Sequence, residues 1–284
     1  MYKEAIQDAI STHELPSEWS SALLSEAEHV AQKKKTAKYR KDLRKLPFVT
    51  IDGEDAKDFD DAIYCVKNTS GYRLYVAIAD VSFYVEANSK LDKEAKKRGT
   101  SIYFPETVIP MLPENLSNGI CSLRPNEDRC SMICEMSIDL DGTRKKYKFY
   151  SGLINSKARL TYNQVEKHFK KSSSIKQSIV RESIKHLFDL TNVRLKLRNQ
   201  RRALEINPTE AILELNKNKE VNNIVIKKNL FAHKLVEESM LLANESAAEF
   251  MHDRLDLGVY RIHEDPDPSK LETLKKHFKV PAQI

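Results

Sequence analysis

The chain has 284 residues, of which 40% are hydrophobic and 31% are charged. This composition excludes a disordered chain, and the length allows one large domain or two small ones with a substantial core. No apolar run approaches the roughly 18 residues of a membrane-spanning helix, and Met1–Ile6 lacks the apolar core of a secretory signal. We therefore expect a cytoplasmic protein that has no membrane partner.

The four cysteines, Cys65, Cys121, Cys130 and Cys134, are too few for the disulfide framework of a secreted domain. Cys130 and Cys134 do not form a CxxC pair, and no histidine lies near them in sequence, so we do not expect zinc. A reducing compartment is the simplest interpretation.

Positive charge exceeds negative charge by six, with 47 Lys and Arg against 41 Asp and Glu. Two basic runs, 33–45 and 194–202, hold much of the excess. Such runs are usually solvated helix faces, and the alternative is contact with the phosphates of a polyanion. The sequence leaves both interpretations open.

Residues 1–46 read as a helical, basic lead-in segment. Ser17 is a candidate N-cap for a helix that runs from Glu18 through the lysine run. The apolar stripe of this helix consists of Leu23, Leu24, Ala27, Val30 and Ala31. We expect the segment to pack on, or connect to, the domain that begins at Pro47.

A block rich in predicted strands follows Pro47. Residues 48–51 form a short apolar strand, and 62–66 and 72–79 form a hairpin around the turn residues 68–71. Ser89 starts a short helix that Gly99 ends. Residues 131–140 alternate in polarity, and Asp141-Gly142 turns them into a second hairpin with 143–154.

The second half is mainly helical, over 161–170, 177–200 and 230–255. Short strands are predicted around 203–206, 211–215 and 221–227. Because helices and strands come in blocks, we expect an α+β fold and not a doubly wound sheet. No glycine-rich phosphate loop of the GxGxxG or Walker type occurs in the sequence.

The segment from Asp52 to Asp61 carries six acids among ten residues: Asp52, Glu54, Asp55, Asp58, Asp60 and Asp61. Such density is costly because close like charges repel, and a hard cation such as Mg²⁺ removes the cost. The spacing fails the EF-hand calcium pattern. A solvated acidic loop is the alternative, but Phe59 and the strand that starts at Ala62 anchor this segment. We therefore predict a metal site.

A metal-bound set of acids beside basic clusters is typical of phosphodiester hydrolysis. Two metal ions about 4 Å apart stabilise both the attacking and the leaving oxygen of such a displacement. The eight histidines are scattered, and no serine, cysteine or histidine arrangement offers a competing nucleophile.

These acids and many later segments resemble one known family. The matching segments are Thr50-Ile-Asp52, Asp58-Phe-Asp60-Asp61-Ala62, Val76–Ser82, Ile109–Pro113, Leu116-Ser117, Cys121–Arg124, Ser156–Leu160 with Tyr162, Leu235–Glu238, Ala243–Glu245, and Tyr260–His263 before Pro266. They are similar to the ribonuclease II / ribonuclease R family, in that family's order. The resemblance implies that 47–284 is the N-terminal part of an RNB catalytic domain, an α+β fold with a mixed sheet surrounded by helices.

The resemblance further implies an Mg²⁺-dependent 3′–5′ exoribonuclease, with Mn²⁺ as a substitute, that hydrolyses single-stranded RNA to nucleoside 5′-monophosphates. Asp52, Asp58, Asp60 and Asp61 match its four metal-binding aspartates, and Asp60 matches the one most important for catalysis. Tyr103 and Tyr162 match RNA-binding tyrosines, although Tyr103 alone would read as a core or edge-strand aromatic. Glu54 and Asp55 fall outside the pattern. Glu238 is either a buried acid that faces the site or a surface residue.

Three features depart from the family. The Ala203–Ile206 region lacks an expected phenylalanine, and the arginine segment that stabilises the scissile phosphate lies beyond Ile284. The family's S1 domain and complete cold-shock domains are also absent from the sequence, so we expect a truncated catalytic domain. A missing C-terminal portion or S1 domain on another chain is a candidate partner, which the sequence leaves open. A second hypothesis is therefore a catalytically silent RNA-binding or regulatory fragment, and a third is a DNA-directed nuclease.

Overall fold

The computed structural model describes residues 2–32, 38–105, 107–171, 175–201, 211–216, 220–226, 229–255 and 258–278. Packing divides the chain into two compact units, 1–243 and 244–284. The first unit holds the sheet and every residue of the candidate site. Among the described residues, no helix is both long and apolar enough to span a bilayer.

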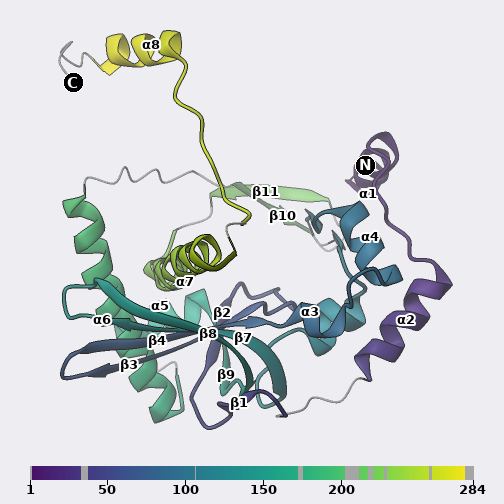
Figure 1. The fold of residues 1–284 in the computed structure, drawn as a ribbon. Helices are drawn as coiled ribbons and strands as arrows, with labels where there is room; N and C mark the ends of the chain where they lie inside the picture. The colour runs from purple at the N-terminus through teal and green to yellow at the C-terminus, as the bar shows by residue number, and fades with distance from the viewer. Residues whose placement is uncertain are drawn as a thin grey trace. The chain divides into compact units, whose positions relative to one another are not determined.

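The elements are drawn in Figure 1. The strands are β1 (Lys41–Asp42), β2 (Val49–Asp52), β3 (Asp61–Asn68), β4 (Gly71–Ala79), β5 (Ile102–Phe104), β6 (Thr107–Ile109), β7 (Asp128–Ile138), β8 (Arg144–Asn155), β9 (Ala158–Thr161), β10 (Ala211–Leu215) and β11 (Val221–Ile226). The helices are α1 (Tyr2–Thr12), α2 (Ser21–Ala31), α3 (Val81–Tyr84), α4 (Lys90–Arg98), the π-helical turn η1 (Asn115–Ile120), α5 (Tyr162–Lys171), α6 (Ser178–Gln200), α7 (Phe231–Leu255) and α8 (Pro268–Phe278).

The main sheet is seven-stranded and mixed, with the strand order β1-β8-β7-β4-β3-β2-β9. Its central strands pair antiparallel, whereas both outer pairs, β1 with β8 and β2 with β9, are parallel. The remaining described strands form two hairpins, β5–β6 and β10–β11. This architecture confirms the predicted α+β fold with a mixed sheet and flanking helices.

The two predicted hairpins of the sheet are confirmed, and glycine conformations account for them. Gly71 opens β4 with φ +143°, and a Cβ atom there would lie 2.1 Å from the carbonyl oxygen of Ile138. Only glycine fits this close approach of β4 to β7. In the second hairpin Gly142 has φ +87°, and Asp141 Oδ1 accepts a hydrogen bond from the Thr143 amide.

Hydrophobic side chains pack on both faces of the sheet because successive residues of a strand point to opposite sides. In β4, Leu74 and Val76 belong to the core that includes α6 and the first turns of α7. Tyr75 and Ala77, on the other face, belong to the core that includes α2 and η1. All four cysteines are buried free thiols. The sheet is thus held from both sides, which fixes the strand ends that carry the acids.

The N-terminal prediction was wrong in two respects. The helix begins at Ser21 and its N-cap is Ser20, whose hydroxyl accepts from the Leu23 amide, and not Ser17. The carbonyl of Glu18 instead accepts a hydrogen bond from Arg98, and this guanidinium lies 3.5 Å from the centre of the Trp19 ring. These contacts hold 18–19 outside the helix.

The lead-in is also not helical throughout, because residues 41–42 form β1 of the main sheet. The part of the predicted helix at 33–37, which is the start of the basic run 33–45, and the predicted strand at 203–206 lie outside the described residues. The strands β5, β6 and β9, the turn η1 and the helices α3 and α8 were not predicted. Helix α4, with the N-cap Ser89 and the C-cap Gly99, is as predicted.

Candidate metal centre

The predicted metal ligands lie at the junction of two neighbouring strands. Asp52 is the last residue of β2 and Asp61 is the first residue of β3, and the two strands pair antiparallel. The connection between them, residues 53–60, carries Asp58 and Asp60. We call residues 52–61 the aspartate segment. Because both ends of this segment are fixed by the sheet, its carboxylates are confined to the region where the end of β2 meets the start of β3.

A buried serine anchors the second half of the aspartate segment. The hydroxyl of Ser122 accepts a 3.0 Å hydrogen bond from the Phe59 amide and donates a 2.8 Å bond to the Lys57 carbonyl. The Phe59 carbonyl accepts from the Leu123 amide at 2.8 Å, and the Phe59 ring is buried. Asp58 and Asp60 therefore flank a residue that is held on both sides of its backbone.

The first half of the segment is held from β9 and α5. Arg159 donates from one guanidinium nitrogen to the carbonyls of Gly53, at 2.7 Å, and Glu54, at 2.5 Å. Asn163 donates a 2.9 Å bond to the Glu54 carboxylate. Sequence reasoning assigned no role to Ser122, Arg159 or Asn163. The only signal for the first two was that they fall within segments that resemble the family.

Three of the four predicted metal ligands, Asp52, Asp60 and Asp61, have a raised pKa. The pKa of Asp52 is raised to about 6. Burial is the largest cause, the negative charges of Asp58 and Asp60 add to it, and the positive charge of Arg159 partly offsets it. The pKa of Asp61 is raised to about 7, mainly by burial and further by the negative charges of Asp52 and Asp60. Partial burial and then Asp58 raise the pKa of Asp60. The four carboxyls thus form one electrostatically coupled set.

Asp52 has a further property that fits a cation. Its Oδ2 atom is buried and accepts no hydrogen bond from any described group. A buried carboxylate oxygen without a donor is costly, and a metal ion is one partner that removes the cost. The donor set is composed of carboxylates, which hard cations such as Mg²⁺ prefer. Within the described part of the chain, however, no three acidic, histidine or cysteine side chains stand close enough to form a preassembled metal site.

Tyr103 lies beside this set, on the β5–β6 hairpin. Its hydroxyl donates a 3.0 Å hydrogen bond to Oδ2 of Asp58, while 65% of the residue remains exposed. Burial of the hydroxyl, followed by the charge of Asp58, raises its pKa. The ring is therefore available to a ligand and tied to the aspartate segment. Of the core and edge-strand positions that Tyr103 alone would indicate, the structure has the edge strand.

Tyr162 is the first residue of α5. β9 pairs with β2 so that Thr161 lies opposite Asp52. Thr161 and Gln164 exchange hydrogen bonds in a capping box that fixes this helix start. Burial, followed by Asp52 and Asp61, raises the pKa of Tyr162 to about 12. Its ring stacks on His233 at a centroid distance of 4.1 Å, a contact that was not predicted.

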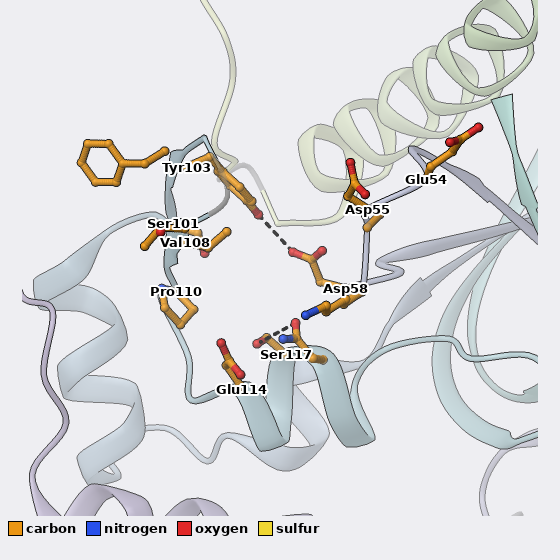
Figure 2. Close-up of a pocket in the computed structure, with 14 residues that line it drawn as sticks. Glu54, Asp55, Asp58, Ser101, Tyr103, Val108, Pro110, Glu114 and Ser117 are labelled. Atoms are coloured by element: carbon orange, nitrogen blue, oxygen red, sulfur yellow. Dashed lines mark hydrogen bonds between the residues drawn. The ribbon is translucent and has the colours of Figure 1, made fainter. Parts of the chain in front are cut away.

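A hollow of about 860 Å³ opens on the Tyr103 side of the aspartate segment (Figure 2). Figure 2 shows the Tyr103 hydroxyl directed at Asp58 across the upper part of this hollow. Glu54 and Asp55, which the resemblance places outside the metal set, are exposed and lie on its rim with Glu114 across from them. The wall also contains polar and small residues: Ser101, Thr107, Ser117 and Asn118.

Glu238 is buried, and it faces basic residues of α6. Its carboxylate is 3.0 Å from Arg198 and 3.5 Å from Arg194, whose side chain is also buried. Arg194 further donates to the carbonyl of Gly142 at 3.0 Å. Glu238 therefore ties α7 to α6 and to the β7–β8 turn.

The sequence of this chain is similar to proteins of one known family. The RNB domain family model matches residues 40–283. Ribonuclease R of Escherichia coli is 43% identical over 279 residues, and ribonuclease R of Thermotoga maritima is 44% identical over 283 residues. These matches cover 95% and 97% of this chain. They cover 34% and 40% of the two relatives, so the chain spans little more than a third of their length.

The fold comparison agrees. A solved structure of Mycoplasma genitalium RNase R in complex with ribose methylated single-stranded RNA superposes with a TM-score of 0.91 at 34% identity. The match covers 96% of this chain and 43% of that one. Because the family model covers most of the sequence and the closely similar fold accompanies it, this chain belongs to the RNB domain family.

Proposed function

We propose that this chain is the metal-binding part of a 3′–5′ exoribonuclease that hydrolyses single-stranded RNA to nucleoside 5′-monophosphates. Asp52, Asp58, Asp60 and Asp61 would hold Mg²⁺, or Mn²⁺ in its place, and Asp60 is the acid most important for catalysis. Bound metal would supply charge stabilisation at the scissile phosphate. Tyr103 and Tyr162 would contact the RNA.

The observation that carries this proposal is the unsatisfied state of the aspartate segment. Asp52 keeps a buried oxygen without a donor among the described groups, and three of the four carboxyls have a raised pKa because of burial and of one another. A structural acid cluster would normally be neutralised by basic partners. Within the described part of the chain, Arg159 is the one cation that lowers the pKa of Asp52. Divalent cations complete such a site and leave coordination positions for phosphate oxygens.

RNA as the substrate is supported by the relatives and by the position of Tyr103. The two relatives are ribonucleases R, and the similar structure of Mycoplasma genitalium RNase R was solved in complex with ribose methylated single-stranded RNA. Tyr103 presents an exposed ring next to Asp58 and at the wall of the hollow. Stacking on an aromatic ring suits a sequence-tolerant enzyme, because every base has a π-face.

The test incubates the purified chain with 5′-labelled single-stranded RNA, with and without Mg²⁺. Asp60→Asn is the inactivating variant, and Asp55→Asn is its matched control, an exposed acid of the same segment that the proposal leaves outside the metal set. We expect stepwise 3′ shortening and release of nucleoside 5′-monophosphates by the unmodified chain and by Asp55→Asn only. Equal shortening by Asp60→Asn would refute the assignment of Asp60.

The second candidate is a catalytically silent RNA-binding fragment. It is favoured by the absence of a preassembled three-ligand group among the described residues. RNA binding without shortening, at any Mg²⁺ or Mn²⁺ concentration, would establish it. A DNA oligonucleotide of the same sequence is tested in parallel. Shortening of this DNA would indicate a DNA-directed nuclease, whereas the exoribonuclease and the silent RNA-binding fragment would leave it intact.

A further inference from the structure

Arg159 contacts both ends of the connection that carries Asp58 and Asp60. Its guanidinium donates to the carbonyls of Gly53 and Glu54, directly after Asp52. The same guanidinium lies 5.7 Å from the centre of the Phe59 ring, between Asp58 and Asp60 in sequence. One half-buried side chain thus bridges the first and the second half of the aspartate segment.

The position of Arg159 is set by the sheet. β9 runs parallel to β2, and Arg159 lies opposite Thr50, two residues before Asp52. The β9 backbone is further fixed because the Lys157 amide donates to the Phe48 carbonyl at 2.7 Å. Asn163, on the helix that follows β9, adds a second tether to Glu54. Arg159 and Asn163 therefore project from a strand and a helix that are themselves fixed. The residues that they contact belong to a connection without regular secondary structure.

A cation in this place has two opposite effects on a metal site. Its charge repels a dication that approaches Asp52. Its hydrogen bonds hold the backbone from which the carboxylates project, and positioning partners of metal ligands commonly contribute strongly to metal affinity. The two effects predict changes of opposite sign when the side chain is neutralised, so they can be separated experimentally.

We propose that Arg159 is a positioning residue: it clasps residues 53–54 and Phe59 and so holds the backbone from which the proposed metal-binding carboxylates project. The inference rests on the proposed metal-dependent function. It concerns the ordering of the segment, and that ordering exists before any metal or RNA is bound.

The key variant is Arg159→Met, which keeps most of the aliphatic stem and removes the charge and the donors. Arg181→Met is the matched control, because Arg181 also donates to two successive carbonyls, those of Ile175 at 3.0 Å and Lys176 at 2.7 Å, away from the aspartates. Arg159→Lys retains the charge without the planar guanidinium. All four proteins are compared at pH 8.5, which lies above the raised pKa values of Asp52 and Asp61.

The first measurement is amide hydrogen exchange of residues 53–60 in the metal-free chain. We expect exchange about 10-fold faster in Arg159→Met, a smaller increase in Arg159→Lys and no change in Arg181→Met. Unchanged exchange in Arg159→Met would overturn the proposal whether or not the chain binds metal. If exchange rises as expected but the unmodified chain binds no Mg²⁺, the clasp stands and the proposed metal centre fails.

The second measurement is calorimetric titration with Mg²⁺ in the absence of RNA. We expect the Mg²⁺ dissociation constant to rise about 10-fold or more in Arg159→Met and to stay unchanged in Arg181→Met. Loss of the positive charge alone would tighten Mg²⁺ binding, so a weaker affinity can only come from lost position. Tighter binding by Arg159→Met would show that charge dominates, and it would overturn the positioning role.

Discussion

The hydroxyl of Tyr103 donates a 3.0 Å hydrogen bond to Oδ2 of Asp58, which joins the β5–β6 hairpin to the aspartate segment. This bond couples a ring that is 65% exposed to an acid that we propose as a metal ligand. The ring and the hydroxyl therefore have separable roles, one toward the base of an RNA and one toward the carboxylate.

Tyr103→Phe and Tyr103→Ala separate these roles. Phenylalanine keeps the stacking surface, so we expect RNA affinity in EDTA to be nearly unchanged. Alanine removes the ring, and we expect affinity to fall by about 1–3 kcal/mol. Fluorescence anisotropy with a labelled oligonucleotide measures both values. An equal loss of affinity in the two variants would show that the hydroxyl, and not the ring, contacts RNA.

The metal-free chain is expected to lose stability as the pH rises through the range in which Asp61 titrates. The pKa of Asp61 is about 7 when folded against an ordinary 3.8, so between these values the folded chain holds a proton that the unfolded chain has released. Each pKa unit corresponds to about 1.4 kcal/mol. Asp61→Asn should therefore raise the melting temperature in EDTA at pH 8 and leave it nearly unchanged at pH 4.

Thermal melts across this pH range measure the effect, and Mg²⁺ provides a control. If the carboxyls bind Mg²⁺, saturating metal should reduce the advantage of Asp61→Asn at pH 8, because only the unmodified chain keeps the full ligand set. An identical gain at pH 4 and pH 8 would contradict the raised pKa of Asp61.

Ser122→Ala should destabilise the fold, since it leaves the Phe59 amide and the Lys57 carbonyl without their shared hydroxyl partner. We expect a decrease of about 1–3 kcal/mol in the free energy of unfolding, the usual cost of buried unpaired polar groups. Urea denaturation measures this change. The control is Ser70→Ala, whose hydroxyl bonds Asn68 in an exposed turn, and it should change the stability little. Equal effects of the two variants would argue against a buried anchor at Ser122.

Glu238→Gln should be more costly than Glu237→Gln, although both acids bond Arg198. Glu238 is buried against the equally buried Arg194, and removal of its charge leaves that guanidinium uncompensated. We expect a loss of about 3 kcal/mol or more for Glu238→Gln. For the half-exposed Glu237 we expect less than about 1 kcal/mol. Urea denaturation curves of the two variants, measured in parallel, test this ranking. A larger loss of stability in Glu237→Gln than in Glu238→Gln would contradict it.

The elements that the sequence predicts are those whose signals are local. The hairpins β3–β4 and β7–β8 alternate in polarity and are closed by turn residues such as Gly71 and Asp141, so their register can be read from short segments. Helix α4 carries its own caps, Ser89 and Gly99. In contrast, the choice of Ser20 over Ser17 as the N-cap depends on Arg98, which is distant in sequence.

The candidate site divides in the same way. The density of acids between Asp52 and Asp61 predicts a cation site, and the resemblance selects four of the six. The groups that hold the segment could not be predicted, because Ser122 and Arg159 lie 63 and 106 residues from their partners Phe59 and Gly53. No local pattern encodes the parallel pairing of β2 with β9 that brings Arg159 there.

That pairing also sets the order of events as the chain is made. β2, with Asp52 at its end, is synthesised before β9, and β3 and β4 follow β2 directly and form a hairpin. β9 can join β2 only after the long intervening stretch has been synthesised and closed into a loop, a slow non-local step. A nascent chain that ends before β9 thus carries all four aspartates without their clasp. The addition of β9 to the sheet is therefore the step at which the backbone of the aspartate segment gains its contacts with Arg159.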